Sequence, residues 1–291
     1  MMLKVNAHTR ICGIIGDPVE HSLSPVMHNA AFHARGINYV YVAFRVPASR
    51  LGAAVAAIRH LNLVGVNVTI PHKETVLAHL DELSEEARLM GAVNTVVRRD
   101  DRLIGHNTDG EGFLQALRAA GFVPAGRSAL LLGAGGAARA VAVALARAGA
   151  ASIAVANRTP ARAERLAAWL ADRLGVAARA VPWPGRDGAR GGREALERAD
   201  LVVHATPLGT YPDTSTGPDL AYECLRPGQL VFDLVYNPPE TAFLARARAA
   251  GAGVVSGLEM LIHQGALAFE LWTDQSPPLD TMRAALREAL L

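Results

Sequence analysis

The chain has 291 residues, 51% of them hydrophobic, and a formal net charge of +2 at pH 7; it is long enough for two domains, and so small a charge gives no support for nucleic-acid binding. Its apolar runs are shorter than a membrane span, the residues from Met1 to Arg10 lack the apolar stretch of a signal peptide, and Cys12 and Cys224 are too far apart for a thiolate metal site. We therefore expect a cytoplasmic protein without a metal, nucleic-acid or membrane partner.

Short apolar strands alternate with helical stretches through the first part of the chain. We expect strands at 11–16, 39–46 and 65–70, helices at 24–34 and 49–60, and a hairpin formed by 91–97 and 103–107. This alternation predicts an α/β fold with a mostly parallel sheet, in which ligands bind at the carboxyl ends of the strands.

Polar residues follow these strands at positions where a ligand would lie. Ser24 precedes a proline and is either a helix N-cap or, with Ser22, a hydroxyl at the edge of a ligand. Lys73 follows the third strand and is either a solvated residue opening a helix toward residue 80 or a functional amine. The chain has only two lysines, and lysine can release a proton whereas arginine cannot. A lysine at this position therefore favours the hypothesis of a functional amine.

Asp109 opens the helix that follows the predicted hairpin. With Thr108 and Glu111 it fits a capping box, so it is either a helix-terminus acid or a site carboxylate. We place the crossing to a second domain at 121–126.

The segment from Gly133 to Ala138 lies between a predicted strand at 128–132 and a helix that continues to Arg147. Gly133, Gly135 and Ala138 fill the small-residue positions of a dinucleotide-binding turn, which allow a tight turn, close approach of a pyrophosphate and packing of helix on strand. A second strand at 152–156 and a helix to residue 174 complete a βαβ unit. The alternative is that the glycines only cap a buried strand.

The end of that second strand indicates which dinucleotide binds. Asn157, Arg158 and Thr159 stand there with Arg162 one turn on, and the first acid is Glu164. An acid would accept from the ribose of NAD, whereas arginine accommodates the 2′-phosphate of NADP, so NADP is favoured. The alternative is that Thr159 only caps the following helix and the arginines are solvated.

Strands and helices continue to alternate through the rest of the chain. We expect strands at 201–206, 230–236 and 254–255, and helices at 241–250, 259–272 and 281–290. The stretch 186–193 is superficially like an RGG segment, and we interpret it as a flexible insertion.

The chain resembles the shikimate dehydrogenase family, NADP-dependent enzymes that reduce 3-dehydroshikimate in aromatic amino-acid (chorismate) biosynthesis. The resemblance covers nearly the whole length and rests on several ordered motifs: 16–18, 21–29, 65–73, 91–95, 107–109, the glycine turn, 157–159, 233–238 and 257–266. It implies a substrate-binding domain of residues 1–121 with 258–291, and a Rossmann-type NADP-binding domain of residues 122–257, the C-terminal helices returning to the first domain.

The resemblance also implies roles for individual residues. Ser22, Ser24 and Tyr236 would hold the substrate carboxylate, and Thr69, Asn94, Asp109 and Gln264 the ring hydroxyls. Lys73 and Asp109 would be the catalytic pair. NADP would be lined by Gly133, Ala134, Gly135, Gly136, Ala137, Asn157, Arg158, Thr159, Arg162, Leu234 and Gly257, with Glu85 as a neighbour. His204 and Thr210 depart from the family, which more often has Asn and Met there.

Two other functions are compatible with these residues. One is a dual quinate/shikimate dehydrogenase, and the other is a regulator of the same fold that senses a nucleotide without catalysis, against which the presence of both Lys73 and Asp109 argues. A homodimer is compatible with the sequence, which does not determine the oligomeric state.

Overall fold

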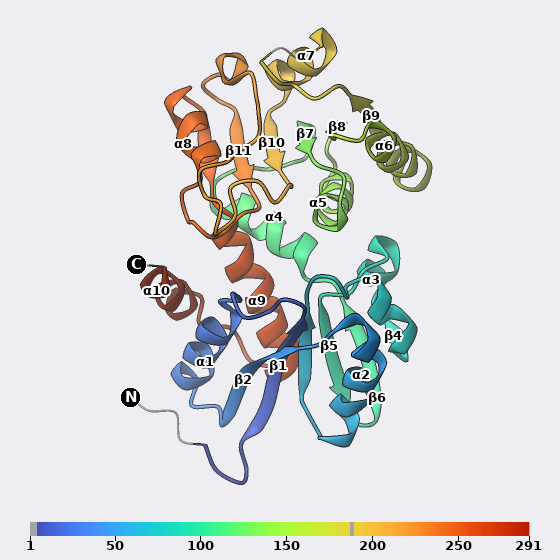
Figure 1. The fold of residues 1–291 in the computed structure, drawn as a ribbon, viewed down its shortest axis with the longest axis vertical. Coiled ribbons are helices and arrows are strands. Elements are labelled where there is room, and N and C mark those ends of the chain that lie inside the picture. The colour runs from blue at the N-terminus through green and yellow to red at the C-terminus, as the bar shows by residue number, and fades with distance from the viewer. Residues whose placement is uncertain (1–4, 187–188, 291) are drawn as a thin grey trace. The chain divides into compact units, whose positions relative to one another are not determined.

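The computed structural model describes residues 5–186 and 189–290 and divides into two units (Figure 1). Unit 1 comprises residues up to 112 and from 262 onward, and unit 2 comprises residues 113–261. The boundaries of these compact units fall within helices α4 (Asp109–Ala119) and α9 (Gly257–Thr273), and the predicted domains, 1–121 with 258–291 and 122–257, stay a prediction. Phe113 and Leu117 of α4 are buried in the core of unit 2.

Unit 1 contains a six-stranded mixed sheet in the order β2-β1-β3-β5-β6-β4. Its strands are β1 (Arg10–Gly16), β2 (Tyr39–Arg45), β3 (Gly65–Val68), β4 (Glu82–Leu83), β5 (Thr95–Arg99) and β6 (Arg102–His106). The central strand β1 is parallel to β2 and β3, and the predicted hairpin is the antiparallel pair β5 and β6. The parallel strands β1 and β3 end at the same edge, and the segment after β3 carries Lys73.

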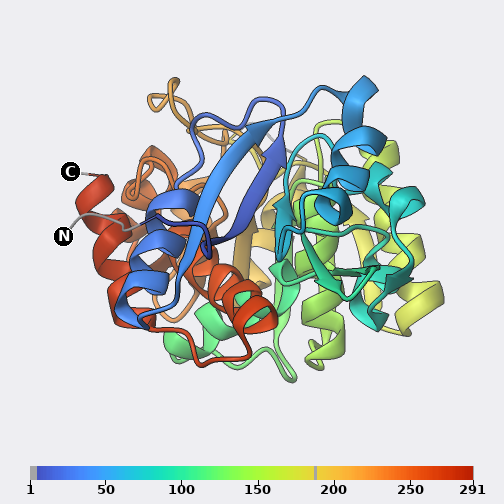
Figure 2. The ribbon, with the colours of Figure 1, turned by 90° about the horizontal axis from the view of Figure 1, so that it is seen from below.

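Helices cover both faces of this sheet (Figure 2). Its helices are α1 (Ser24–Ala34), α2 (Leu51–His60), α3 (Glu85–Met90), α10 (Leu279–Ala289) and the later turns of α9, with 3₁₀ turns η1 (Ala48–Arg50) and η2 (Thr75–His79). On one face α2 and η2 bury an aliphatic core. On the other, Phe32 of α1 stacks on Phe269 of α9 with ring centroids 5.5 Å apart.

Two predictions for unit 1 are corrected. Lys73 does not open an α-helix, because only the 3₁₀ turn η2 follows it. Ser24 is the first residue of α1 and not its N-cap: Leu23 occupies that position, and no side chain caps the helix. The hydroxyl of Ser24 is therefore not used in capping.

Unit 2 contains a six-stranded parallel sheet in the order β12-β11-β10-β7-β8-β9. Its strands are β7 (Ser128–Leu132), β8 (Ser152–Ala156), β9 (Ala177–Val181), β10 (Leu201–His204), β11 (Leu230–Asp233) and β12 (Gly253–Val255). The strand order reverses between β7 and β10, and ligands of such sheets bind at this switch point.

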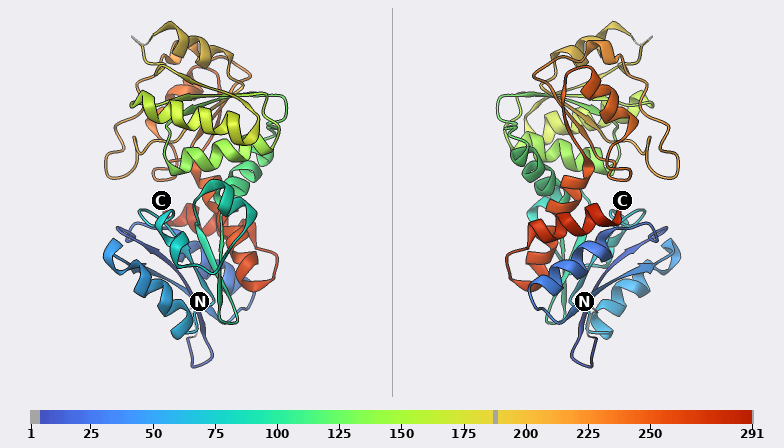
Figure 3. Two further views of the ribbon diagram at one scale, coloured as in Figure 1. Left: turned by 90° about the vertical axis from the view of Figure 1, so that its right-hand side faces the viewer. Right: turned by 90° about the vertical axis from the view of Figure 1, so that its left-hand side faces the viewer.

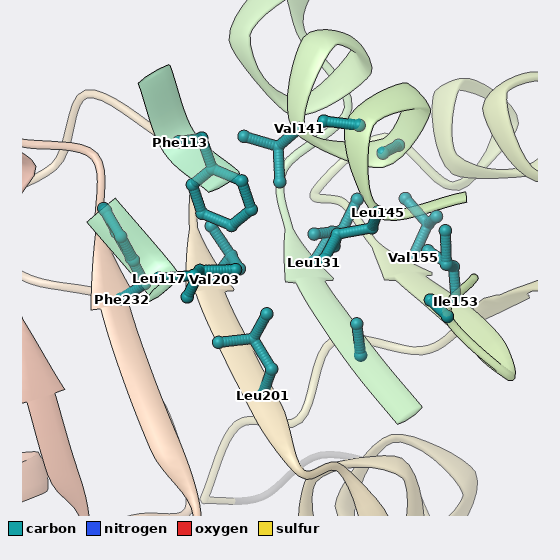
Figure 4. Close-up of a cluster of buried hydrophobic side chains, with 14 of the residues drawn as sticks. Phe113, Leu117, Leu131, Val141, Leu145, Ile153, Val155, Leu201, Val203 and Phe232 are labelled. Atoms are coloured by element: carbon teal, nitrogen blue, oxygen red, sulfur yellow. The ribbon is translucent and has the colours of Figure 1, made fainter. Parts of the chain in front are cut away.

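The faces of the unit 2 sheet are buried by different helices (Figure 3). Its helices are α5 (Gly136–Arg147), α6 (Pro160–Leu174), α7 (Arg190–Arg198), α8 (Ala242–Ala249) and the later turns of α4, with a 3₁₀ turn η3 (Tyr222–Cys224). The core beneath α4, α5 and α6 is shown in Figure 4, and α7, η3 and α8 cover the opposite face.

The interpretation of 186–193 as a flexible insertion is wrong for its last residues. Arg190 begins α7, which packs Ala195 and Leu196 into the core. The apolar residues that drive this packing lie beyond the glycine-rich stretch, and residues 187 and 188 lie outside the described part of the chain. Within 5–186 and 189–290 no helix has the length and apolar character needed to cross a membrane.

Candidate active site

Lys73 and Asp109 form an ion pair in unit 1. Lys73 Nζ lies 2.6 Å from Asp109 Oδ2, and the two side chains are 29% and 10% exposed. The Val93 N–H donates to the Lys73 carbonyl at 2.8 Å, and the neighbouring His72 ring, buried at 1% exposure, donates to the Val46 carbonyl at 2.6 Å. The segment after β3 is therefore anchored on both sides of the lysine.

Asn94 holds the other oxygen of Asp109. Its Nδ2 donates to Asp109 Oδ1 at 2.8 Å and also lies within reach of Thr108 Oγ1 (2.9 Å) and Gln264 Oε1 (3.3 Å). Three acceptors share two N–H donors, so a ligand oxygen could replace one of them without leaving an unpaired donor. The structure thus brings together the predicted catalytic pair and two of the residues predicted to bind the ring hydroxyls.

A second layer of polar residues lies behind Asn94. The amide of Asn67, a buried residue of β3, donates to the Asn94 carbonyl (3.1 Å) and Thr95 Oγ1 (3.0 Å), and its oxygen accepts from the Tyr41 hydroxyl at 2.7 Å. Burial raises the pKa of Tyr41 well above its usual value, which keeps the phenol a donor. The sequence motifs assigned no role to these residues. The sequence does contain one indication that Asn67 makes buried hydrogen bonds, because it is a polar residue between two valines in an apolar strand.

The other predicted substrate residues of unit 1 occupy the same edge of the sheet. Thr69 follows β3 and is partly exposed. Ser22 and Ser24 follow β1, where the Ser24 N–H donates to Ser22 Oγ at 3.3 Å. Tyr236 belongs to unit 2 and is therefore described separately from these unit 1 residues. Burial raises the pKa of its phenol.

The glycine turn of unit 2 lies at the switch point, directly after β7. Gly133 has φ +127°, and a Cβ there would lie 2.7 Å from the carbonyl oxygen of Ala205. At Gly135 and Gly136 a Cβ would meet no atom within 4 Å. Gly135 is the N-cap of α5 and no side chain caps the helix, so its first amides are available to an anion. The turn therefore fits a dinucleotide pyrophosphate, with Ala134 and Ala137 beside these glycines.

The segment after β8 presents the predicted phosphate-binding arginines. Arg158 and Arg162 are exposed. Asn157 Nδ2 donates to the Thr159 carbonyl at 3.0 Å and orders the loop. Thr159 is the N-cap of α6 and Pro160 is its first residue, as the alternative interpretation predicts, although the Thr159 side chain makes no capping hydrogen bond.

Two further predicted cofactor residues contact each other in unit 2. A Cβ at Gly257 would lie 2.5 Å from the Leu234 carbonyl oxygen, so glycine permits this close approach. Glu85 is an exposed residue in the first turn of α3, in unit 1, and is not grouped with the residues after β7 and β8. The described residues contain no group of three or more metal-binding side chains.

The fold defines a two-unit α/β protein with a Rossmann-type dinucleotide-binding unit. Family models match residues 14–96 ("Shikimate dehydrogenase substrate binding domain"), 118–211 ("Shikimate / quinate 5-dehydrogenase") and 257–287 ("Shikimate 5'-dehydrogenase C-terminal domain"). A relative from Methanopyrus kandleri, named shikimate dehydrogenase (NADP(+)), is 53% identical over 289 residues, which are 99% of this chain and 98% of the relative.

Comparison with solved structures points to the same family. A shikimate dehydrogenase in complex with NADP+ has a TM-score of 0.92 at 42% identity, covering 99% of this chain and 98% of the other. The Thermus thermophilus enzyme in complex with NADP(H) and shikimate has a TM-score of 0.85 at 44% identity, covering 97% and 100%. The chain belongs to the shikimate dehydrogenase family.

Proposed function

We propose that this protein catalyses the reversible NADPH-dependent reduction of 3-dehydroshikimate to shikimate. The observation that carries the proposal is the Lys73–Asp109 pair at the carboxyl edge of the unit 1 sheet, held by Asn94, in a chain whose other unit has an open dinucleotide turn. The proposal includes the predicted assignment of ligands to domains: residues 1–121 and 258–291 bind the substrate, and residues 122–257 bind NADP.

Bound NADPH would supply the hydride, and the protein must supply a proton to the carbonyl oxygen. The Lys73 ammonium stabilises negative charge as it develops on that oxygen and then transfers a proton to it. Asp109 keeps Nζ in place through Oδ2, while Asn94 fixes Oδ1. In the reverse direction neutral Lys73 takes the proton from the alcohol.

The remaining residues of unit 1 would orient the substrate. Ser22 and Ser24 would donate to the carboxylate, and Thr69, Asn94 and Gln264 to the ring hydroxyls. Tyr236 would join the carboxylate site and Glu85 would lie near the cofactor. The cytoplasmic location and the homodimer stay predictions.

In unit 2 the glycine turn and the first amides of α5 would hold the pyrophosphate. Arg158 and Arg162 would pair with the 2′-phosphate, because no acid between Asn157 and Arg162 competes for them or accepts from a ribose hydroxyl.

The test is steady-state absorbance of the reduced nicotinamide with shikimate or quinate, each with NADP and with NAD. We expect the highest kcat/KM with shikimate and NADP. Comparable turnover of quinate would support the dual dehydrogenase. NADP binding without turnover of either substrate would instead support the nucleotide-sensing regulator.

A further inference from the structure

His204 joins two loops of unit 2 at the switch point. The side chain is fully buried at the end of β10, its Nδ1 lies 2.9 Å from Asp233 Oδ1, and its Nε2 lies 2.5 Å from Thr206 Oγ1. Because a carboxylate only accepts, Nδ1 carries a proton. In the neutral ring Nε2 is then an acceptor, and the Thr206 hydroxyl donates to it.

The bond to His204 fixes the side chain of Thr206 in one orientation. With Oγ1 turned to the imidazole, the methyl Cγ2 lies 3.3 Å from the position that a Cβ of Gly133 would take. The Ala205 carbonyl oxygen is nearer still, at 2.7 Å from the same position. The segment after β10 therefore packs on the first glycine of the dinucleotide turn, and His204 determines which atoms of Thr206 face it.

Asp233 extends the connection to the segment after β11. Its Oδ1 also accepts from the Val235 N–H at 3.0 Å, and its Oδ2 accepts from the hydroxyl of Thr241, the N-cap of α8, at 2.6 Å. The N–H of Leu234, a predicted cofactor residue, donates to the His204 carbonyl at 2.9 Å. One buried imidazole and one buried carboxylate thus connect the segments that follow β10 and β11.

We propose that His204 is a positioning residue for NADP, acting through Thr206 on the glycine turn and through Asp233 on the Leu234 segment. The inference rests on the proposed use of NADP. Asparagine, the residue expected here in the family, ends near the position of Nδ1, so it could keep a bond to Asp233 but could not also reach Thr206. The Thr206 bond is therefore a feature that histidine adds.

The test compares Thr206→Val, Thr206→Ser and His204→Asn with the unchanged protein. Each protein is assayed for NADP affinity by titration, for kcat and both KM values, and for thermal stability. Losing this partly buried hydrogen bond should raise Kd and KM for NADP roughly five- to tenfold in T206V and H204N. KM for shikimate and kcat should change less, and T206S should recover most of the loss, because it restores the hydroxyl.

Two comparisons make the result decisive. The matched control is Thr214→Val, at an exposed threonine elsewhere in unit 2, which should bind NADP like the unchanged protein. The double variant H204N/T206V should be no weaker than the worse single variant, because both remove the same bond. Lower thermal stability with unchanged NADP affinity would overturn the inference. An unchanged protein that does not use NADP would instead contradict the proposed function.

Discussion

The two sites are built in opposite ways. In unit 1 long polar side chains hold one another, from Lys73 and Asp109 through Asn94 to the buried Asn67. In unit 2 the site is mainly backbone, and the glycines leave space where a side chain would stand. The chemical step depends on the identity of a few atoms, whereas binding a pyrophosphate depends on open space and amide donors. Substitutions should therefore affect kcat in unit 1 and cofactor affinity in unit 2.

The largest expected effect is on Lys73. Lys73→Arg keeps the positive charge but removes a group that can release a proton, so both K73R and K73A should lower kcat by roughly 10² to 10⁴. KM for shikimate should change much less, because Thr69, Asn94 and Gln264 remain. Asp109→Asn should also lose rate, with a greater weakening of substrate binding.

Steady-state kinetics of these three variants across pH, with folding checked by thermal melting, measures this. A K73R enzyme that turns over near the parent rate would remove the lysine from the proton path and leave it a positioning cation.

The second prediction separates folding from binding in the glycine turn. Gly135→Ala should leave stability nearly unchanged, because its Cβ meets no atom, yet it should raise KM for NADP by roughly tenfold or more by blocking the pyrophosphate. Gly133→Ala is the matched comparison and should also destabilise unit 2, because its φ is +127° and its Cβ would overlap Ala205. Thermal melting and NADP titration of both variants measure this. Equal losses of stability would contradict it.

The third prediction concerns the choice of cofactor. Charge-assisted hydrogen bonds contribute roughly 1.5 to 3 kcal/mol, so Arg158→Ala should raise KM for NADP about tenfold or more while changing KM for NAD little. Kinetics with both cofactors, with a control variant Arg165→Ala at an exposed arginine of α6, measures this. Equal changes for NAD and NADP would exclude a role in recognising the 2′-phosphate.

The smallest effect is on the acid stability of unit 1. His28 is fully buried, makes no hydrogen bond with either ring nitrogen, and stacks on Tyr41; burial lowers its pKa from about 6.5 to about 3. Below pH 6.5 the unfolded chain takes up a proton that the folded chain excludes, so this group makes stability fall as pH falls. Between pH 6.5 and 5.5 the loss should be about 1 kcal/mol.

Denaturant unfolding at the two pH values measures it, and His28→Leu, which cannot be protonated, provides the reference. His106, whose pKa burial also lowers, is present in both proteins. A parent and a variant with the same pH dependence would show that His28 is not responsible.

Much of the fold could be predicted because the strands are short apolar runs bounded by turn residues. The mixed order of the unit 1 sheet could not, since it depends on pairing between distant strands such as β4 and β6. The chain also crosses between the units within α4, because the apolar stripe that begins at Phe113 belongs to the core of unit 2. Local turn signals at 121–126 carry no information about that core.

The candidate site residues came from motifs, whereas their mutual support came only from the structure. The resemblance predicts that Asn94 binds a hydroxyl, but nothing in the sequence indicates that it also holds Asp109. The capping roles considered for Ser24 and Thr159 were local inferences, and the structure uses neither hydroxyl in that way. In the sequence His204 stands out only because it departs from the residue expected in the family. Its contacts with Thr206 and Asp233 could not be predicted, since they depend on the pairing of β10 with β11.

The scarcity of lysine makes the ion pair of unit 1 observable without any mutation. The chain contains only Lys4 and Lys73, and Lys4 lies outside the described residues. Protein grown with lysine labelled with ¹⁵N at the side-chain amine would therefore give at most two side-chain nitrogen resonances, one of them from the amine beside Asp109. Its chemical shift, followed as pH or ligand is varied, would report the protonation of that one amine directly, so the protein carries its own spectroscopic probe at the proposed centre of its chemistry.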